Sequence, residues 1–302
     1  MRQAVIDIGS NSVKLLIADC IDDKIHPLKE TSCQTRLGQG LHQLSELQPK
    51  AIEKTVESVR NFIRFAESAN VEKIQVIATS AVREANNADQ LINAIEHPVS
   101  ILSGDDEAKF SFAGVMTSSH LAGDNILVVD AGGGSTEFTS GNFSGAVRHI
   151  SISLGSVKLM ESYPVSDNPT SEQLQAVRNA IDSQINNIIF SDAWKSNSNS
   201  LLVGVGGVAT IFAMMELSIE DFDRKRIEQV ALSTEQIVDW SEKLWSLPLI
   251  KRKEIKGLPA NRADVALYGC LIYERILLGL HYEELQICTR GIRFGALVNN
   301  IL

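Results

Sequence analysis

The stretch that decides the fold lies near the N-terminus and contains Val5-Ile6-Asp7-Ile8-Gly9-Ser10-Asn11-Ser12-Val13-Lys14. A second copy in the middle of the chain contains Val129-Asp130-Ala131-Gly132-Gly133-Gly134-Ser135-Thr136-Glu137. When Asp7 is aligned with Asp130, the glycines and serines of the two stretches fall into register, and Lys14 is aligned with Glu137. Each copy is an apolar run, an acid, a turn of small residues and a return to β-prone residues. The repeat predicts two loops, one in each half of the chain, that face one ligand.

The residue types of this turn suit an anion. Glycine lets the backbone turn tightly, so that successive N–H groups form an anion-binding nest. Ser10, Ser12 and Ser135 add hydroxyl donors. Donors beside a carboxylate suit phosphate with a divalent cation, since Mg²⁺ usually binds one or two carboxylates together with waters and phosphate oxygens. The alternative is a pair of ordinary β-hairpins whose glycines serve only the turn, and two copies in register favour the phosphate interpretation.

Length and composition exclude several classes of protein. The chain has 302 residues, of which 44% are hydrophobic, and its net charge is −9. The length suits two domains, and an acidic chain lacks the basic face that broad nucleic-acid binding needs. There is no run of apolar residues long enough to span a bilayer and no basic leader, so no membrane partner is expected. Four dispersed cysteines without ligand spacing favour a reducing, cytoplasmic location.

Alternating strands and helices predict an α/β architecture, with an N-terminal domain of residues 1–122 and a C-terminal domain of residues 123–302. The predicted strands are Ala4–Ile8, Val13–Asp19, Lys73–Thr79, Val99–Leu102, Ile126–Asp130, Leu201–Val205 and Leu285–Cys288. The predicted helices are Pro49–Ala69, Asn87–Glu96, Asp105–Ser118, Ser171–Phe190, Thr234–Trp245, Arg262–Leu280 and Arg293–Ile301. The last helix is a candidate to pack back onto the N-terminal domain. The charged segment Glu216–Glu228 and the polar residues Ser196–Ser200 are predicted to be loops.

Two further groups of residues follow predicted strands. Arg83 comes shortly after the strand that ends near Thr79, where a guanidinium can clamp phosphate bidentately; a lone arginine is more often an ordinary surface residue. The acidic run Asp105-Asp106-Glu107 opens a helix. Its carboxylates either cap that helix, which is their common role, or supply a general base that deprotonates a water.

The stretch Gly204-Val205-Gly206-Gly207-Val208-Ala209 follows a strand and loosely matches the dinucleotide-binding fingerprint. The match is weak because the acids that should contact the ribose, Asp221 and Asp223, lie in a polar stretch rather than at a strand end. Gly204, Gly206 and Gly207 fit better as a third loop that approaches the same ligand closely.

These segments together resemble the exopolyphosphatase/guanosine pentaphosphate phosphatase family (Ppx/GppA), in a short two-domain form. The resemblance runs nearly end to end, and its segments are Asp7–Ser12, Arg36–Leu41, Ala78–Arg83, Gly104–Ala108, Asp130–Glu137, Gly204–Thr210, Arg262–Asp264 and Thr289–Gly295. The pair of D-x-G-S-N-S and D-x-G-G-G-S-T-E is highly specific. The resemblance implies two actin-like domains of the ribonuclease H-like (ASKHA) superfold with a cleft between them.

The resemblance also implies a role for each matched position. Glu107 would be the general base, Arg83 would hold the terminal phosphate, and Glu137 would help to position the water. Asp7, Asp130 and Glu137 would bind Mg²⁺, with Mn²⁺ as a possible substitute. The phosphate oxygens would be bound by Ser10, Asn11, Ser12, Gly132, Gly133, Gly134 and Ser135 together with Arg83.

The chain departs from the family pattern at two positions. Asp106 stands where the family usually has the first glutamate of a pair, and Glu107 keeps the second. Val208 stands where the third glycine motif usually has threonine, so one hydroxyl is missing and nucleotide recognition is in doubt.

The expected function is release of the terminal phosphate of inorganic polyphosphate by a metal-dependent phosphohydrolase. Guanosine pentaphosphate is the alternative substrate, guanosine tetraphosphate a further possible ligand, and a homodimer the expected assembly. Two hypotheses of other classes stay open: a phosphotransferase between polyphosphate and a nucleotide, and a non-catalytic sensor of phosphate or nucleotide.

Overall fold

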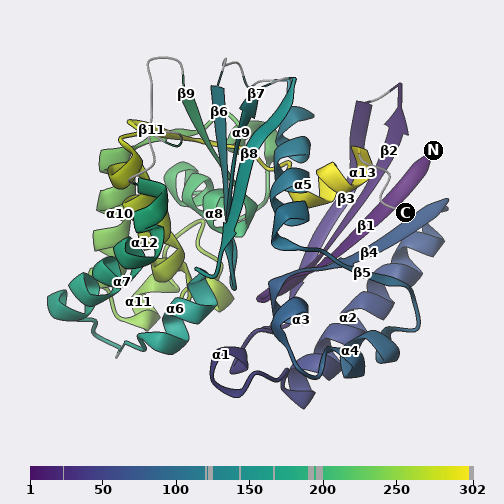
Figure 1. Ribbon diagram of the computed structural model, residues 1–302, viewed down its shortest axis with the longest axis horizontal. Helices are drawn as coiled ribbons and strands as arrows, with labels where there is room; N and C mark the ends of the chain where they lie inside the picture. The colour runs from purple at the N-terminus through teal and green to yellow at the C-terminus, as the bar shows by residue number, and fades with distance from the viewer. Residues whose placement is uncertain are drawn as a thin grey trace. The chain divides into compact units, whose positions relative to one another are not determined.

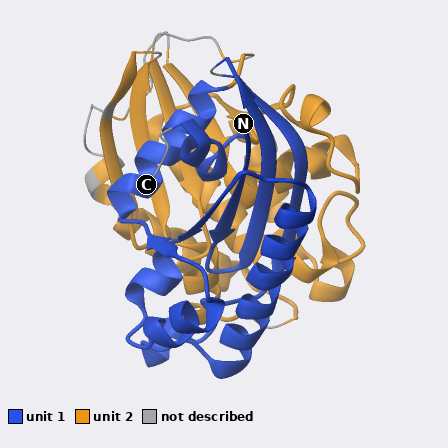
Figure 2. Cartoon of the chain, turned by 90° about the vertical axis from the view of Figure 1, so that its right-hand side faces the viewer, with its two compact units in different colours: residues 1–117, 290–302 blue, residues 118–289 orange. Residues whose placement is uncertain are grey.

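The computed structural model describes residues 1–22, 24–119, 121, 125–142, 144–165, 167–189, 194 and 200–298. The chain divides into two compact units (Figure 2), of which unit 1 is Met1–Thr117 with Arg290–Leu302 and unit 2 is Ser118–Thr289. Each unit contains one β-sheet and its own hydrophobic core. The α/β class predicted from the sequence is therefore confirmed. The sequence predicts the domain boundary at residue 122, which lies outside the described residues.

The sheet of unit 1 has the strand order β3-β2-β1-β4-β5. Its strands are β1 (Arg2–Ile8), β2 (Ser12–Ile21), β3 (Lys24–Gln34), β4 (Lys73–Ala78) and β5 (Val99–Ile101). β1 and β2 pair antiparallel, as do β2 and β3, whereas β4 runs parallel to β1 and β5 parallel to β4. The carboxyl ends of β1, β4 and β5 therefore meet at one edge of the sheet, which is where ligands bind in open α/β sheets.

The helices of unit 1 cover both faces of this sheet, and they are α1 (Leu41–Leu44), α2 (Pro49–Ser68), α3 (Ser80–Glu84), α4 (Ala88–Ile95), α5 (Gly104–Met116) and α13 (Ile292–Val298). α2 and α4 lie side by side (Figure 1) and bury Val59 and Leu91 against one face. α2 is amphipathic and has Pro49 in its first turn, where the missing N–H costs no hydrogen bond. On the other face, Phe294 and Leu297 of α13 are buried against Val5.

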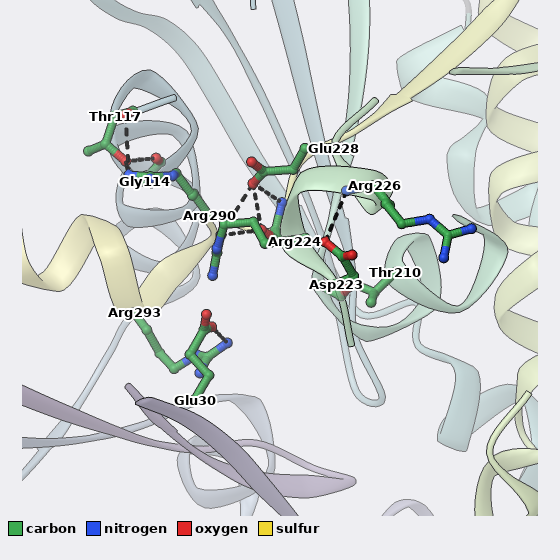
Figure 3. A network of polar contacts seen from close by, with 12 residues as sticks. Glu30, Gly114, Thr117, Thr210, Asp223, Arg224, Arg226, Glu228, Arg290 and Arg293 are labelled. Carbon is green, nitrogen blue, oxygen red and sulfur yellow. Dashed lines mark hydrogen bonds and ion pairs between the residues drawn. The ribbon is translucent and has the colours of Figure 1, made fainter. Parts of the chain in front are cut away.

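α13 packs tightly on α5 through two glycines. A Cβ atom on Gly114 would overlap the carbonyl group of Gly291, and one on Gly295 would overlap that of Phe110. Arg290 fixes the segment before α13, since its Nη1 donates to both the carbonyl oxygen and Oγ1 of Thr117 at 3.3 Å (Figure 3). The C-terminal segment is thus an integral part of unit 1.

The sheet of unit 2 has the strand order β10-β11-β9-β6-β7-β8. Its strands are β6 (Asn125–Ala131), β7 (Thr136–Asn142), β8 (Gly145–Ile152), β9 (Ser200–Val205), β10 (Ala231–Ser233) and β11 (Glu284–Ile287). β6 pairs antiparallel with β7, and β7 with β8, whereas β6, β9 and β11 are parallel. The order β8-β7-β6-β9-β11 repeats that of unit 1, so the sequence repeat reflects a repeated topology.

The helices of unit 2 are α6 (Ser156–Ser162), α7 (Ser171–Ile189), α8 (Gly206–Leu217), α9 (Arg224–Ile227), α10 (Thr234–Ser246), α11 (Leu249–Arg252) and α12 (Ala266–Leu280), with a 3₁₀ turn at Ala260–Arg262. α12 is apolar on nearly all sides and buried, as a central helix must be. Its Tyr273 hydroxyl lies 2.9 Å from the carbonyl oxygen of Val129 and 3.1 Å from that of Val205. The prediction that α12 starts at Arg262 is wrong by four residues.

The prediction of a loop over Glu216–Glu228 is also wrong in part, because α8 extends to Leu217 and α9 lies within this segment. Ile227 is fully buried. Glu228 Oε1 accepts hydrogen bonds from the backbone N–H and Oγ1 of Thr289, and Arg224 donates to both Glu228 and Thr289 (Figure 3). The charges of this segment are therefore partly paired with one another rather than all solvated.

Parts of three predicted segments fall beyond the described residues. These are residues 196–199 of the predicted polar loop, Phe190 at the end of the predicted helix Ser171–Phe190, and the part of the final predicted helix after Val298. Among the helices that the structure describes, none combines the length and the apolar character needed to cross a membrane.

Candidate functional site

The first repeated turn connects β1 to β2 in unit 1. Gly9 N–H donates to the carbonyl oxygen of Ser12 at 3.1 Å, which closes the turn. Asp7 and Lys14 are direct cross-strand partners, and Lys14 Nζ lies 3.9 Å from Asp7 Oδ2. Asp7 is buried, so its carboxylate lies in an apolar strand end next to one ammonium group.

Neighbouring segments hold this first turn in place. The carbonyl oxygen of Ser10 accepts from Gly38 N–H at 2.8 Å, and that of Asn11 accepts from Thr35 and Arg36 N–H at 3.1 and 3.0 Å. Ser10 Oγ lies 3.1 Å from Ser80 Oγ, at the start of α3. The segment after β3, whose signal in the sequence is its family resemblance, thus supports the first turn.

The second turn connects β6 to β7 in unit 2 and repeats the geometry of the first. Gly132 N–H donates to the carbonyl oxygen of Ser135 at 2.9 Å. Asp130 and Glu137 are direct cross-strand partners, as Asp7 and Lys14 are in unit 1. Glu137 is buried, and its Oε1 accepts a hydrogen bond from Ser151 Oγ at 2.8 Å. The second copy therefore holds two carboxylates where the first holds an ion pair.

The start of α6 supports the backbone of the second turn. Ser156 N–H donates to the carbonyl oxygen of Gly132 at 3.0 Å, and Val157 N–H donates to that of Gly133 at 2.9 Å. A Cβ atom on Gly155 would overlap the peptide unit of Gly133. The carbonyl oxygens of Gly132 and Gly133 thus accept hydrogen bonds from the start of α6.

The third glycine loop lies against the second turn. Gly206 opens α8 with a φ of 82°, and a Cβ atom there would overlap Oδ1 of Asp130. A Cβ atom on Gly207 would meet Nη1 of Arg262. Unit 2 therefore brings together the predicted residues Asp130, Glu137, Gly206 and Gly207, and it adds Arg262.

No role for Arg262 is predicted from the sequence. The resemblance of its segment to the family is its only signal in the sequence. Burial lowers the pKa of the Arg262 guanidinium from its ordinary value, but an arginine side chain remains protonated in proteins. The third glycine loop is therefore next to a positive charge.

Unit 1 brings Arg83 and Glu107 together. Arg83 is on α3, after β4, and Glu107 is on the first turns of α5, after β5. Arg83 Nη1 donates to Glu107 Oε1 at 3.1 Å and to the carbonyl oxygen of Leu102 at 2.6 Å. The Glu107 side chain is 5% exposed and that of Arg83 27% exposed. Because the strands preceding both residues are in the parallel part of the sheet, the pair lies at the same edge as Asp7.

The two departures from the family pattern have structural explanations. Ser103 caps α5, because its Oγ accepts from Asp106 N–H at 3.1 Å, and the same hydroxyl donates to Asp106 Oδ2 at 2.7 Å, so the Asp106 side chain holds the capping hydroxyl. The neighbouring Glu107 is the buried carboxylate of the pair. Val208 packs against Gly269 of α12, where a Cβ atom would meet both of its methyl groups.

The carboxylates of the second turn fit the requirements of a magnesium ion. Among residues 1–298, outside the gaps stated above, no three His, Cys, Asp or Glu side chains gather as a complete metal-binding cluster. Mg²⁺ does not require one, because it is commonly bound by one or two carboxylates and completes its octahedron with water and phosphate oxygens. Asp130 and Glu137 supply two carboxylates on adjacent strands. The joint role of Asp7 with this pair stays a prediction.

The fold and the glycine loops have counterparts in known proteins. The family model of the Ppx/GppA phosphatase family matches residues 16–302. The chain is 32% identical, over 99% of its length, to a bifunctional 3-dehydroquinate synthase/phosphatase of Fusobacterium nucleatum, and it spans 46% of that relative's length. It is 24% identical to exopolyphosphatase 1 of Mycobacterium tuberculosis, with 100% of the chain and 88% of the relative aligned. The crystal structure of the Aquifex aeolicus family member has a TM-score of 0.82 and 28% identity, and the match covers 99% and 97% of the two chains.

The fold and the loops thus define a two-domain α/β protein of the actin-like class with phosphatase relatives. The chain belongs to the Ppx/GppA phosphatase family. The family and the fold class predicted from the sequence are confirmed, and with them, at the level of the family, the enzyme class of a phosphatase.

Proposed function

We propose that this protein releases the terminal phosphate from inorganic polyphosphate in a magnesium-dependent hydrolysis. The observation that carries the proposal is the turn built twice with one backbone geometry, in which Lys14 of the first copy is replaced by Glu137 in the second. A glycine turn beside two carboxylates combines backbone N–H donors with ligands for a divalent cation. This combination suits a phosphate chain that carries its own metal ion.

Glu107 is the general base of the proposed reaction. It accepts a proton from a water, the water oxygen attacks the terminal phosphorus, and the P–O bond to the rest of the chain breaks. An ion pair with a guanidinium favours the ionised carboxylate, which is the form able to accept a proton. Arg83 is in hydrogen-bond contact with Glu107, and its further N–H groups are suited to a phosphate oxygen. Arg83 thus aligns the base with the phosphate that it acts on.

Each unit has one loop that is suited to phosphate oxygens. Ser10, Asn11 and Ser12 act from the first turn, and the Gly132–Ser135 backbone and Ser135 hydroxyl act from the second. Asp130 and Glu137 would hold Mg²⁺, with Mn²⁺ as a possible replacement, and Asp7 is a further candidate ligand. When bound, the ion would neutralise charge on the transferring phosphoryl group, the main source of catalysis in this class of reaction.

Polyphosphate is preferred over guanosine pentaphosphate for two reasons. The Mycobacterium tuberculosis relative that is aligned over this whole chain is named an exopolyphosphatase. In addition, the side chain of Val208 at the third glycine loop is apolar and packs on α12, so it offers no hydroxyl to a nucleotide. Guanosine pentaphosphate is the second candidate because the guanidinium of Arg262 lies beside Gly207 in the same loop, where it can bind a polar base or a phosphate.

The test is phosphate release from each substrate, measured with Mg²⁺ and again after chelation of divalent metal. We expect a higher kcat/KM for polyphosphate than for guanosine pentaphosphate, and loss of release after chelation that Mg²⁺ restores. A clear preference for the nucleotide would reverse the order of substrates. Transfer of phosphate to ADP in place of release would establish a phosphotransferase, and binding without turnover of any phosphoanhydride would establish a sensor.

A further inference from the structure

Tyr273 of α12 is a buried polar side chain that has no part in the proposed reaction. Its hydroxyl lies within hydrogen-bond distance of two carbonyl oxygens, at 2.9 Å from that of Val129 and 3.1 Å from that of Val205. A tyrosine hydroxyl has a single proton, so the two carbonyl oxygens share one donor. Burial raises the pKa of Tyr273 well above its ordinary value, and the charge of Asp130 raises it further. The hydroxyl therefore keeps its proton and acts as the donor.

The two acceptors lie one residue before two parts of the candidate site. Val129 precedes Asp130 on β6, and Val205 ends β9 just before Gly206 opens α8. β6 and β9 are parallel, and the last pair of their ladder is Asp130 with Val205. Beyond this pair the two chains separate, since β6 leads into the second turn and β9 into α8. The Tyr273 hydroxyl thus links the two strands at the point where they separate.

The packing at this point leaves little room for displacement. A Cβ atom on Gly206 would overlap Oδ1 of Asp130, and one on Gly204 would lie 3.2 Å from Cε1 of Tyr273. The Tyr273 ring also meets Phe212 of α8 edge to face, with the ring centroids 6.1 Å apart. A change in the separation of β6 and β9 would therefore move the Asp130 carboxylate relative to the third glycine loop.

Two ion pairs fix the direction in which α12 presents Tyr273. Arg178 Nε and Nη2 donate to the two carboxylate oxygens of Glu274 at 2.7 and 2.9 Å. Arg275 Nε and Nη2 donate in the same way to Asp182 at 2.7 and 2.9 Å. Arg178 and Asp182 are on α7, which packs beside α12 (Figure 1). Because bidentate pairs are geometrically specific, these two hold the residues that follow Tyr273 in one rotation about the axis of α12.

We propose that Tyr273 is a positioning residue for the metal site: its hydroxyl pins the ends of β6 and β9 and so sets the Asp130 carboxylate where it binds a divalent cation. The metal-binding part rests on the proposed function, whereas the pinning of the two strands does not.

The bonding of Tyr273 differs from that of a tyrosine that only satisfies its own hydroxyl. One acceptor is enough for that purpose, as at the buried Tyr268, whose hydroxyl donates to the carbonyl oxygen of Tyr163 at 2.6 Å. Tyr273 instead has acceptors on two strands, each next to a residue of the site. Groups that orient a metal ligand typically contribute about 10–100-fold to metal affinity, which sets the size of the expected effect.

The experiment compares the wild type with Tyr273→Phe, which removes one oxygen atom and keeps the ring. Mn²⁺ is the probe, and its binding in the presence of orthophosphate is measured by electron paramagnetic resonance. We expect the dissociation constant of Mn²⁺ to rise about tenfold or more. In the metal-free protein, hydrogen exchange measured by mass spectrometry should become faster in the peptides that contain Asp130 and Gly206, because the strand ends open more readily.

The matched control is Tyr268→Phe, which also removes one buried hydroxyl from α12. Both variants should lose similar stability in urea unfolding, since each loses one buried hydrogen bond. Only Tyr273→Phe should change Mn²⁺ affinity and exchange at the strand ends, and equal values for the two variants would overturn the proposal. A wild type that binds no Mn²⁺ would instead overturn the metal site of the proposed function, and the exchange measurement alone would then decide whether the hydroxyl pins the strands.

Discussion

Replacing Glu107→Gln should lower kcat for phosphate release by about 10²–10⁴-fold, the usual contribution of a general base. The substitution keeps the shape of the side chain and an oxygen that can accept from Arg83, so substrate binding should change little. What it removes is the capacity to take a proton from water. The loss should therefore appear in kcat, while the affinity for a polyphosphate that is bound but not cleaved stays near the wild-type value.

The matched control is Asp106→Asn, one residue earlier on the same helix. The Asp106 carboxylate accepts from the hydroxyl of Ser103, which caps α5. Its replacement should cost stability of about 1 kcal/mol or less, since asparagine keeps a hydrogen-bonding side chain, and kcat should stay within a few-fold. If Asp106→Asn abolished release and Glu107→Gln did not, the roles of the two acids would be exchanged.

Replacing Gly206→Ala should reduce phosphate release by about a hundredfold or more, because a displacement of about 1 Å in a catalytic group can cost that much. The added Cβ would overlap Oδ1 of Asp130, so either this carboxylate or the loop must move. The backbone at Gly206 also has a φ of 82°, a conformation that costs a residue with a side chain about 1–2 kcal/mol.

Gly40→Ala separates these two effects. Gly40 has nearly the same backbone conformation, with a φ of 78°, but a Cβ there would make only ordinary contacts at 3.7 Å, to Gln48 and Leu44. Both variants should lose stability in urea unfolding, whereas Gly206→Ala alone should lose activity. Equal activity of the two variants would mean that the third glycine loop does not set the position of Asp130.

The strand–turn–strand repeat could be predicted from the sequence because it combines a local turn with buried apolar runs. The prediction missed β3, whose exposed and half-buried residues include Pro27 and several charges. An edge strand such as this is paired on one side only and needs no apolar alternation.

The segment containing α9 was missed because its charges looked solvated. In the structure Glu228 and Arg224 form hydrogen bonds with Thr289, which is 61 and 65 residues away along the chain.

The candidate site was predictable where one motif contains the interacting groups. The pairings Asp7 with Lys14 and Asp130 with Glu137 follow from the register of each hairpin. The choice between Asp106 and Glu107 was not predictable from residue type, since both open the same helix. It follows from the helical rotation, which turns Glu107 inward to Arg83 and leaves the Asp106 side chain bonded to the capping residue Ser103. The contact between Gly207 and Arg262 joins residues 55 positions apart and has no local signal.

The most direct test of the central claim is turnover of polyphosphate by the wild-type protein in ¹⁸O-labelled water with Mg²⁺, followed by mass analysis of the released orthophosphate. Attack of water on the terminal phosphorus predicts one ¹⁸O atom in each released phosphate. Hydrolysis by water attack would be contradicted if no phosphate were released, or if phosphate appeared without the label on an added nucleotide acceptor.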